Sequence, residues 1–488
     1  MWRFVRKRVR KFIKMNLFFK IIYILSFILL FFPALSIPLG KPVSIFFIVT
    51  TLFFILYNLF FAKKFIKILF FAYKKTPFKY FVYWFSWIVI SGLILVLLNK
   101  YTIGHYIYYL VLFLIINMTL PLLLPIITIT KRLHLQKFIK FYCIMSIIIF
   151  SLGMLNFIGS IFEISLVKNL FNMVVVNSRS LSGGLGTVAM YGNRVYSVFA
   201  EPGWFAGWIC LNLPIFYYLS KKENKIFEQS FLNKLIKILL IPMAWLCLVL
   251  TQSPIWLIFS LIVTFVMYFK NLVFYIKKQF IAIITGIIIT GVILIITSNY
   301  IDLKETYLVR IFNVFLIKDI IDFIHIEASL SNRLLCYYHS ILVFIKYPLL
   351  GIGLGNAKYY IASFFETSNL PLTPEIYAYL DIYYLTGKMN YNGAFFYDLL
   401  AETGIFSFLL FYFFIYKLRV VLNKNLKFIN SKTIQNFAKG IRFSLLIFIP
   451  LSLYDICFPF VHIWFLFGLA ITILCLVKKE EIKGVLYK

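Results

Sequence analysis

Residues 80–98 read YFVYWFSWIVISGLILVLL, a run of nineteen positions without a charged side chain. A helix rises about 1.5 Å per residue, so a run of this length matches the roughly 30 Å hydrocarbon core of a bilayer. Lysines bound the run on both sides, at Lys79 and Lys100. Runs of similar length recur along the chain, and the sequence therefore predicts an all-α polytopic membrane protein.

The composition supports the same fold class. Of the 488 residues, 62% are hydrophobic and 20% aromatic, and the mean hydropathy is +0.93. Soluble domains average roughly 45–50% apolar residues, so the solvent of this chain is expected to be lipid. The net charge of +32 comes from basic residues dispersed between apolar runs. That dispersal is typical of positive-inside loops and excludes nucleic acid as a partner.

Apolar runs of spanning length predict about twelve membrane helices. Pro121 and Pro125 are expected to kink the fourth of them. The basic start, MWRFVRKRVRKFIKMN, precedes a full-length run without a small-residue cleavage site, which predicts a retained first helix. The predicted spans lie near residues 16–36, 42–62, 80–98, 106–130, 138–162, 203–220, 235–251, 254–269, 279–298, 395–416, 441–457 and 459–477.

If successive spans cross the membrane in alternating directions, the connections on its two sides differ in charge. Five strongly basic connections and both termini fall on one side, which the positive-inside rule makes cytoplasmic. The opposite side carries most of the acidic residues and two long external segments, 163–202 and 299–394. The chain thus divides into spans one to five (1–162), the first external segment (163–202), spans six to nine (203–298), the large external segment (299–394), and spans ten to twelve with the tail (395–488).

The large external segment stays rich in apolar residues and is predicted to contain interfacial helices. YLVRIFNVFLIKDIIDFI has helical spacing with its charges on one face. SNRLLCYYHSILVFIKYP predicts a second helix, with Ser329 or Ser331 as its cap and Pro348 beyond its end. The following GIGLGN predicts a turn. No internal repeat is visible, so an inverted-repeat transporter gains no support.

The predicted topology places four arginines outside, all in the two long segments: Arg179, Arg194, Arg310 and Arg333. A guanidinium stays charged and grips phosphate with two parallel hydrogen bonds, so this placement favours an anionic ligand. Arg333 is predicted in the first turn of its helix, where unpaired N–H groups favour a phosphate. The alternative is an ion pair of Arg333 with Glu327 or Asp322.

Three carboxylates stand at predicted helix entrances. Glu201 directly precedes Pro202, and it is either a helix-capping carboxylate or a base that faces a cavity. Asp398 and Glu402 are one helical turn apart, and they face either one cavity or the water.

His325 and His339 are further external candidates, although a lone histidine more often has a structural role. The six cysteines form no CxxC pair, and no Asp-x-Asp pair or His/Cys cluster stands at ligand spacing. The sequence therefore predicts neither a metal site nor a cofactor.

Three segments together resemble the O-antigen polymerase and O-antigen ligase superfamily of bacterial membrane enzymes. They are RVYSVFAEPGWFAGW (194–208), LTQSPIWLIFSLIV (250–263), and SNRLLCYYHSILVFIKYPLLGIGLGN (331–356) followed by NGAFFYDLLAETGIFSFLLF (392–411). Their order, spacing and predicted external placement carry the resemblance, which covers roughly residues 190–420.

Two departures from the family pattern bear on the activity. Pro254 stands where the family's Ser-Arg pair has its arginine. The His-Asn typical of ligases is missing, because Asn392, Gly393 and Ala394 occupy that region. The resemblance therefore favours a polymerase over a ligase.

The resemblance implies a fold similar to that of GT-C glycosyltransferases, in a bacterial inner membrane with the active site on the external, periplasmic side. It implies a glycosyltransferase that joins polyprenyl-pyrophosphate-linked repeat units into a surface polysaccharide, O-antigen or capsule. Glu201 is then the catalytic base. Arg194 and Arg333 bind the pyrophosphate, with Arg310 and Arg179 as weaker candidates. His325, His339, Asp398 and Glu402 are secondary candidates.

The expected partners are polyprenyl-pyrophosphate-linked oligosaccharides, membrane lipid, a chain-length regulator and a flippase. Two alternatives stay open: a ligase that transfers finished glycan to another acceptor, and a flippase or transporter of the same lipid-linked sugars.

Overall fold

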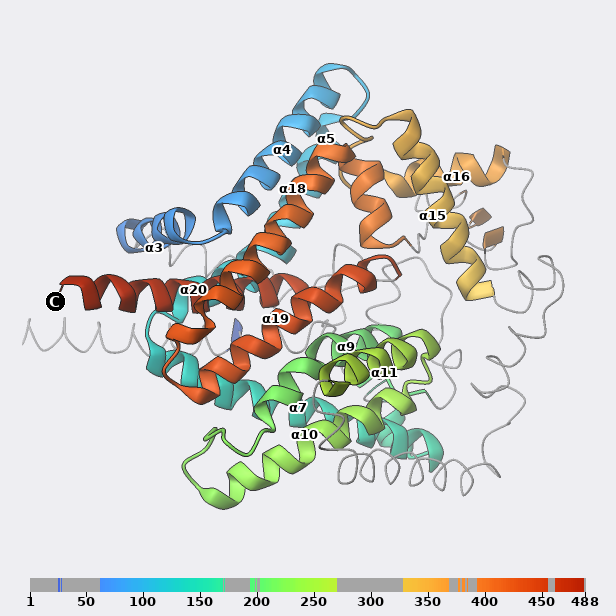
Figure 1. Cartoon of the computed structure of the whole chain (residues 1–488). Coiled ribbons are helices and arrows are strands. Elements are labelled where there is room, and N and C mark those ends of the chain that lie inside the picture. The colour runs from blue at the N-terminus through green and yellow to red at the C-terminus, as the bar shows by residue number, and fades with distance from the viewer. Residues whose placement is uncertain are drawn as a thin grey trace, which may run out of the picture.

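A computed structural model describes most of the chain between residues 62 and 486. The described residues are 62–169, 171, 194–197, 199, 202–269, 328–367, 393–454 and 461–486, with isolated positions near residues 26 and 380. Every regular element among them is a helix (Figure 1). The predicted spans near 16–36, 42–62 and 279–298 lie almost wholly outside the described residues, as does the predicted interfacial helix 307–324.

The described helices follow the predicted order of apolar runs. In chain order they are α3 (Ala62–Lys75), α4 (Phe78–Leu97), α5 (Ile103–Phe113), the π-helical η1 (Leu114–Leu123), α6 (Leu124–Thr128), α7 (Arg132–Ile161), α9 (Pro202–Leu219), α10 (Ser230–Leu250), α11 (Pro254–Phe269), α15 (Ala328–Lys346), α16 (Ala357–Thr367), α18 (Phe395–Asn425), η4 (Leu426–Phe428), α19 (Lys432–Ser452) and α20 (Val461–Leu486).

Five helices within the described part are long and apolar enough to cross a membrane. They are Phe78–Leu97, Arg132–Ile161, Phe231–Leu250, Phe395–Phe428 and Val461–Glu480. Two shorter apolar helices, Ile103–Phe113 and Ile255–Met267, accompany them. All seven coincide with predicted spans, so the all-α membrane class predicted from the sequence is supported by the helices themselves.

Prolines set several helix boundaries. Pro202 and Pro254 are the first residues of α9 and α11, where the absent N–H would have had no partner inside the helix. The fourth predicted span is interrupted as expected. Pro121 lies inside the π-helical η1, and Pro125 lies in the first turn of α6. A proline cannot donate to the preceding turn, which explains why α5, η1 and α6 do not form one regular helix.

The connections gather at two ends of the bundle. At one end, here called the basic end, lie the α3–α4, α6–α7, α9–α10 and α18–α19 connections and the C-terminus of α20 (Figure 1). There, Lys225 N donates to Thr433 Oγ1 at 3.1 Å, and Lys140 Nζ pairs with Glu228 at 3.3 Å. At the opposite end, Tyr101 Oη donates to Leu354 O at 2.5 Å. These contacts join the connections within each end of the bundle.

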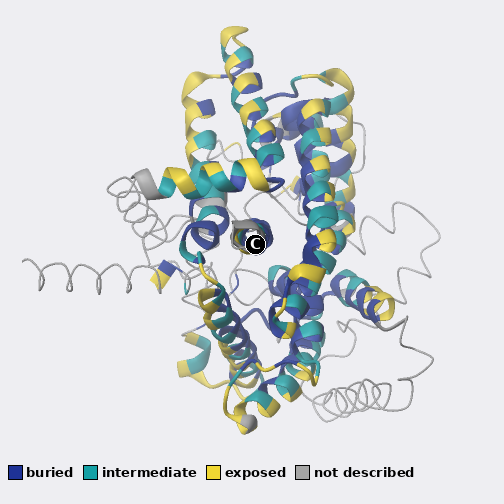
Figure 2. Ribbon diagram, turned by 60° about the vertical axis from the view of Figure 1, so that its left-hand side comes forward, coloured by how far each residue is buried: buried dark blue, intermediate teal, exposed yellow. Residues whose placement is uncertain are grey.

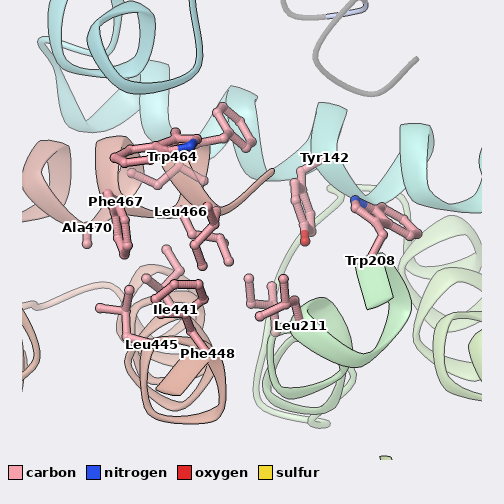
Figure 3. Packing of buried hydrophobic residues seen from close by; sticks show 14 of the residues in the cluster. Tyr142, Trp208, Leu211, Ile441, Leu445, Phe448, Trp464, Leu466, Phe467 and Ala470 are labelled. Atoms are coloured by element: carbon pink, nitrogen blue, oxygen red, sulfur yellow. The ribbon is translucent and has the colours of Figure 1, made fainter. Parts of the chain in front are cut away.

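Two helices form the centre of the packing. Nearly every side chain of α9 is buried, against α7, α10, α11 and α19. Helix α20, seen end-on near the C label in Figure 2, packs against α3, α6, η1, α18 and α19. Figure 3 shows how their side chains meet those of α7 and α19; labelled there are Tyr142, Trp208, Leu211, Ile441, Leu445, Phe448, Trp464, Leu466, Phe467 and Ala470.

Glycines allow the closest of these helix contacts. A Cβ on Gly440 of α19 would lie 2.6 Å from Ile215 Cα on α9. A Cβ on Gly468 of α20 would lie 2.6 Å from the carbonyl oxygen of Leu122, beside the Pro121 interruption. Both crossings bring backbone against backbone, as small residues do in membrane helix pairs.

The predicted external helix is α15, and it ends at Lys346, before Pro348, as expected. Its start differs from the prediction. Ser329 and Ser331 lie inside the helix, which already includes Ala328, so neither serine caps it from outside. The helix begins earlier because Ala328 and Leu330 are good helix formers, and their propensity outweighs the preference of serine for the cap.

We expect Gly440→Ala to lower the stability of the folded protein by about 1–3 kcal/mol, because the added methyl group overlaps the α9 backbone. The measurement is the thermal unfolding midpoint in detergent. Gly104→Ala is the matched control, since nothing lies within 4 Å of a Cβ at Gly104. There, alanine should be neutral or stabilising by roughly 0.5–1 kcal/mol. Equal midpoints for the two variants would contradict the close α9–α19 contact.

Candidate functional site

Arg194 is held by the turn between α10 and α11. Its Nε donates to Thr251 O at 3.0 Å, and its Nη2 donates to Ser253 Oγ at 3.2 Å. Next to it, Val195 N donates to Leu250 O at 3.0 Å. The first two segments of the family resemblance, 194–208 and 250–263, therefore meet directly. The two side-chain contacts orient the guanidinium plane of Arg194.

The α10–α11 turn has the geometry needed to present these acceptors. Gln252 has φ 48°, a left-handed conformation that few non-glycine residues adopt. Thr251 Oγ1 donates to Leu248 O at 2.7 Å, which ends α10, and Pro254 starts α11. The family's arginine position is thus the first residue of a helix here, where proline is favoured.

Tyr454, just beyond α19, connects this turn with α15. Its ring lies edge-on to Trp256 of α11, with ring centroids 6.1 Å apart. On the side of α15, Arg333 Cζ lies 5.1 Å from the Tyr454 ring centroid, and Tyr337 Oη donates to the Tyr454 carbonyl. Arg194 and Arg333 are therefore joined through one short path of contacts, by way of the turn, Trp256 and Tyr454.

The predicted first-turn position of Arg333 is wrong. Because α15 includes Ala328, Arg333 lies in the second turn, beyond the unpaired N–H groups of the helix start. The argument from the helix dipole does not apply to it. Arg333 lies over the aromatic ring of Tyr454, a contact that favours a planar cation. The alternative partners Glu327 and Asp322 lie outside the described residues.

A joint between two distant segments fixes α15 in place. It pairs residues 348–353, which follow α15, with residues 401–405 of α18. Ile352 N donates to Ala401 O at 3.0 Å, Gly353 N to Glu402 O at 2.8 Å, and Ile405 N to Pro348 O at 2.9 Å. We call this pairing the backbone joint. It brings together the two parts of the third resemblance segment.

Glycine is required on both sides of the backbone joint. Gly351 has φ 67° and Gly404 has φ 74°, both in the left-handed region. A Cβ on Gly351 would lie 2.4 Å from the Glu402 carbonyl carbon. A Cβ on Gly404 would lie 2.2 Å from Leu349 O. The predicted turn at GIGLGN is present, and its glycines serve this close approach.

Glu402 and Asp398 are both buried, each 7% exposed, so the alternative in which they face the water is wrong. Glu402 Oε1 accepts from Ala357 N, the first residue of α16, at 3.2 Å. It acts as the cap of that helix from a distant part of the chain. Glu402 also lines a narrow cavity between α4, α5 and the joint, with Ser91 and Tyr106. Asp398 is not among its lining residues.

His339 packs between α15 and α16. It is 3% exposed, and its ring centroid lies 5.0 Å from that of Phe364. Burial lowers the pKa of His339 to about 4, although a hydrogen bond with the Tyr360 backbone opposes the shift. The imidazole is therefore neutral near pH 7, and its surroundings favour a packing role over the catalytic role considered from the sequence.

Other predicted site residues lie outside the described residues: Glu201, Arg179, Arg310 and His325. Across the ranges that are described, no three His, Cys, Asp or Glu side chains gather at a distance that could hold a metal ion. Metal independence of the activity stays a prediction.

Sequence reasoning missed the aromatic residues that join the two arginines. Trp256, Tyr337 and Tyr454 were taken as parts of apolar runs. Tyr337 also stacks on Tyr397, with ring centroids 4.7 Å apart and an interplanar angle of 16°. One signal was present for Tyr454, since it begins the Tyr-Asp pair that interrupts the apolar run between α19 and α20. Nothing in the sequence pairs these positions with each other.

The arrangement combines cations, hydroxyls and aromatic faces at the end of the bundle opposite the basic end. Two oriented guanidinium groups suit a phosphate or pyrophosphate. Ser253 and Tyr337 supply hydroxyl groups nearby. A comparison of the sequence with models of protein families and with characterised proteins finds no match.

The buried His339 should make stability depend on pH in a defined window. An ordinary histidine has a pKa near 6.5, so the unfolded chain takes up a proton as the pH falls below that value, whereas the folded chain resists until about pH 4. Stability should therefore be lost as the pH falls from 6.5 to 4, by roughly 3 kcal/mol from this residue.

The measurement is the thermal unfolding midpoint of the protein in detergent across this window. His339→Gln, which cannot take up a proton, should show a shallower pH dependence than the native protein. His134→Gln, at an exposed position, should keep the native dependence. An unchanged slope for His339→Gln would contradict the low pKa of His339.

Proposed function

We propose that this chain is a metal-independent membrane glycosyltransferase that polymerises polyprenyl-pyrophosphate-linked oligosaccharide repeat units into a surface polysaccharide. In this proposal the chain has about twelve spans in a bacterial inner membrane, with both termini cytoplasmic and the site on the external side. The proposal draws on the apolar helices, on the charge difference between the two ends, and on the three sequence segments that resemble the polymerase and ligase superfamily.

One observation carries the proposal. The three segments are far apart in the chain, yet Arg194 contacts the α10–α11 turn, and Tyr454 joins that turn to Arg333 on α15. The two arginines expected to bind pyrophosphate thus belong to one contact network. A resemblance by chance would not require its separate parts to lie together.

The position of this network suits a lipid-linked substrate. It lies where α10 and α19 end and α11 begins, against the first half of α15. Lipid tails would remain among the spans, the sugar would lie over the external segments, and the pyrophosphate between them would face Arg194 and Arg333. The low external charge of a positive-inside protein makes these arginines well suited to an anionic group.

The reaction needs one bond made and one broken. A hydroxyl oxygen of the incoming unit forms a bond with the anomeric carbon of the growing chain. The bond from that carbon to the pyrophosphate oxygen breaks, and the lipid pyrophosphate leaves with the bonding electrons. Glu201 takes the hydroxyl proton. The arginines stabilise the charge on the leaving group, and the aromatic residues help to fix the two substrates.

The alternatives differ in their products. A ligase would transfer finished glycan to another acceptor, whereas a flippase would move lipid-linked sugars without making a glycosidic bond. The missing ligase histidine favours the polymerase. The discriminating experiment supplies the purified full chain with a synthetic lipid-linked repeat unit. A ladder of longer lipid-linked glycans supports the polymerase, and the absence of any new glycosidic bond counts against it.

We expect Arg333→Lys to lose most of the polymerase activity, by on the order of a hundredfold and close to the loss in Arg333→Ala. Lysine keeps the charge but lacks the planar fork needed to grip a pyrophosphate in two places. The assay is the rate of ladder formation from the synthetic repeat unit.

Arg132→Lys is the matched control, because Arg132 starts α7 at the basic end of the bundle. That variant should keep the native rate. Native-length polymer at a native rate from Arg333→Lys would remove the bidentate role of Arg333.

Glu201→Gln separates the two interpretations of Glu201. Glutamine keeps the shape and an acceptor oxygen but takes no proton near neutral pH. If Glu201 is the base, the variant should bind lipid-linked sugar and form no ladder. If Glu201 only caps α9, the variant should lose about 1 kcal/mol of stability and keep its activity. Full polymerisation by the folded variant would overturn the base assignment.

A further inference from the structure

A second candidate site lies at the basic end, away from the arginine network. A pocket of about 450 Å³ opens between the end of α9, the end of α11, the last turns of α18 and the middle of α19. Small-molecule sites in proteins are usually of roughly 300–1,000 Å³, so the pocket is large enough for a lipid headgroup. Three cations line it: Lys221, Arg419 and Arg442.

The three cations are half-buried, and two of them, Lys221 and Arg442, lie over aromatic rings. Lys221 Nζ lies 4.7 Å from the ring centroid of Tyr218, and Arg442 Cζ lies 4.8 Å from that of Phe443. Tyr218 and Phe443 stack on each other with centroids 5.8 Å apart. Arg442 Nη1 also donates to Asn423 Oδ1. The rings and the amide orient the cations, and none of them neutralises the positive charge.

Carboxylates at this end are engaged elsewhere. Among described residues at this end, Glu228 pairs with Lys140 and Glu223 with Lys432, so neither salt bridge includes a pocket cation. Glu223 is the nearest acid that influences Lys221, and its Oε1 also accepts from Asn436 Nδ2 at 2.8 Å. The pocket itself contains no acidic side chain.

This arrangement has an electrostatic cost that an anion would relieve. Burial lowers the pKa of Lys221, which means that its charge is poorly solvated. Arg419 and Arg442 repel each other across the pocket. Partly buried like charges attract a counter-ion more strongly than exposed ones, because water screens them less.

The other wall of the pocket is apolar and continues onto the outer surface of the bundle. Val266 and Met267 on α11 and Leu446 on α19 line it. Val266 is 51% exposed, and it continues a row of exposed apolar residues on α11 that includes Ile258, Ile262 and Phe265. In a membrane this row would face lipid. The pocket therefore presents cations at one side and a hydrocarbon surface at the other.

We propose that this pocket binds an anionic glycerophospholipid, with the phosphate between Lys221, Arg419 and Arg442 and an acyl chain along Val266 and Leu446. The positive-inside rule makes the basic end cytoplasmic, where anionic lipids meet basic pockets between helices. The shared chemistry is a phosphate ester, and the apolar wall selects the lipid over a soluble phosphate. The site is independent of the polymerase proposal, since it shares no residue with the network of Arg194, Tyr454 and Arg333.

The test measures lipid binding to the purified full chain in detergent by native mass spectrometry. Phosphatidylglycerol is titrated against phosphatidylcholine, and the native protein should retain one phosphatidylglycerol in preference. The triple variant Lys221→Gln/Arg419→Gln/Arg442→Gln should weaken that binding by roughly a hundredfold, because each basic side chain near an anionic lipid contributes about a fivefold gain in affinity.

The matched control removes the same number of charges from the same end. Lys222, Lys225 and Lys427 are exposed and do not line the pocket, so their change to glutamine should leave the preference intact. Leu446→Trp keeps every charge and fills the apolar wall, and it should also displace the lipid. This second variant keeps the test decisive if the triple variant does not fold.

Three results would overturn the proposal. Equal losses in the pocket triple variant and the control would show that only the net surface charge attracts lipid. Native binding by both the pocket triple variant and Leu446→Trp would exclude the pocket. Complete displacement of the phospholipid by millimolar glycerol 3-phosphate would mean that the pocket takes a soluble phosphate ester and does not need the acyl chain.

Discussion

The backbone joint between residues 348–353 and 401–405 is the contact on which the candidate site depends. Three N–H to carbonyl hydrogen bonds cross it, and Gly351 and Gly404 allow the two backbones to approach. Backbone groups away from water must find partners, so two irregular segments that pair with each other satisfy both at once. The joint anchors α15 and α16 beside α18, as Figure 1 shows, and Glu402 caps α16 from the same segment. The hydrogen bond from Tyr337 Oη to the Tyr454 carbonyl and the stacking of Tyr337 on Tyr397 add further contacts that hold α15.

The position of α15 then determines which side chains meet. Its residues Arg333 and Tyr337 lie against Tyr454, and Tyr454 in turn contacts Trp256 on α11. The turn before α11 holds Arg194. Each contact in this network joins an irregular or terminal segment to a helix that the bundle core keeps rigid. The buried α9 and α20 therefore supply the fixed frame, and the joint places α15 on that frame. A site built in this way can be precise even though its residues come from distant parts of the chain.

The sequence predicted well whatever depends on local composition. Apolar length located the described spans, Pro121 and Pro125 marked the interrupted helix, and Pro348 marked the end of α15. It predicted poorly the features that depend on contacts between residues far apart in the sequence. Ser331 and Arg333 were assigned by their offset from an expected helix start, and one extra turn at Ala328 changed both assignments. The glycines of GIGLGN predicted a turn correctly, but a backbone partner some fifty residues later leaves no pattern in side-chain types. The contacts of Tyr454 were missed for the same reason, because a single aromatic residue in an apolar run does not indicate which distant residues it will contact.

The cations at the two ends of the bundle differ in number and in the role that we assign to them. At the basic end positive charge is abundant, and its general role is to fix the orientation of the chain in the membrane. Lys221, Arg419 and Arg442 differ from the other cations at this end, because they are half-buried together in a pocket that no acidic side chain lines. Such a group of cations favours the binding of an anion. The topology predicted from the sequence places the opposite end outside, where the positive-inside rule disfavours arginines. Arg194 donates to a turn carbonyl and a serine hydroxyl, and Arg333 lies over a tyrosine ring. Such contacts fix the plane of a guanidinium group, and a fixed plane is what a two-pronged contact with a phosphate requires.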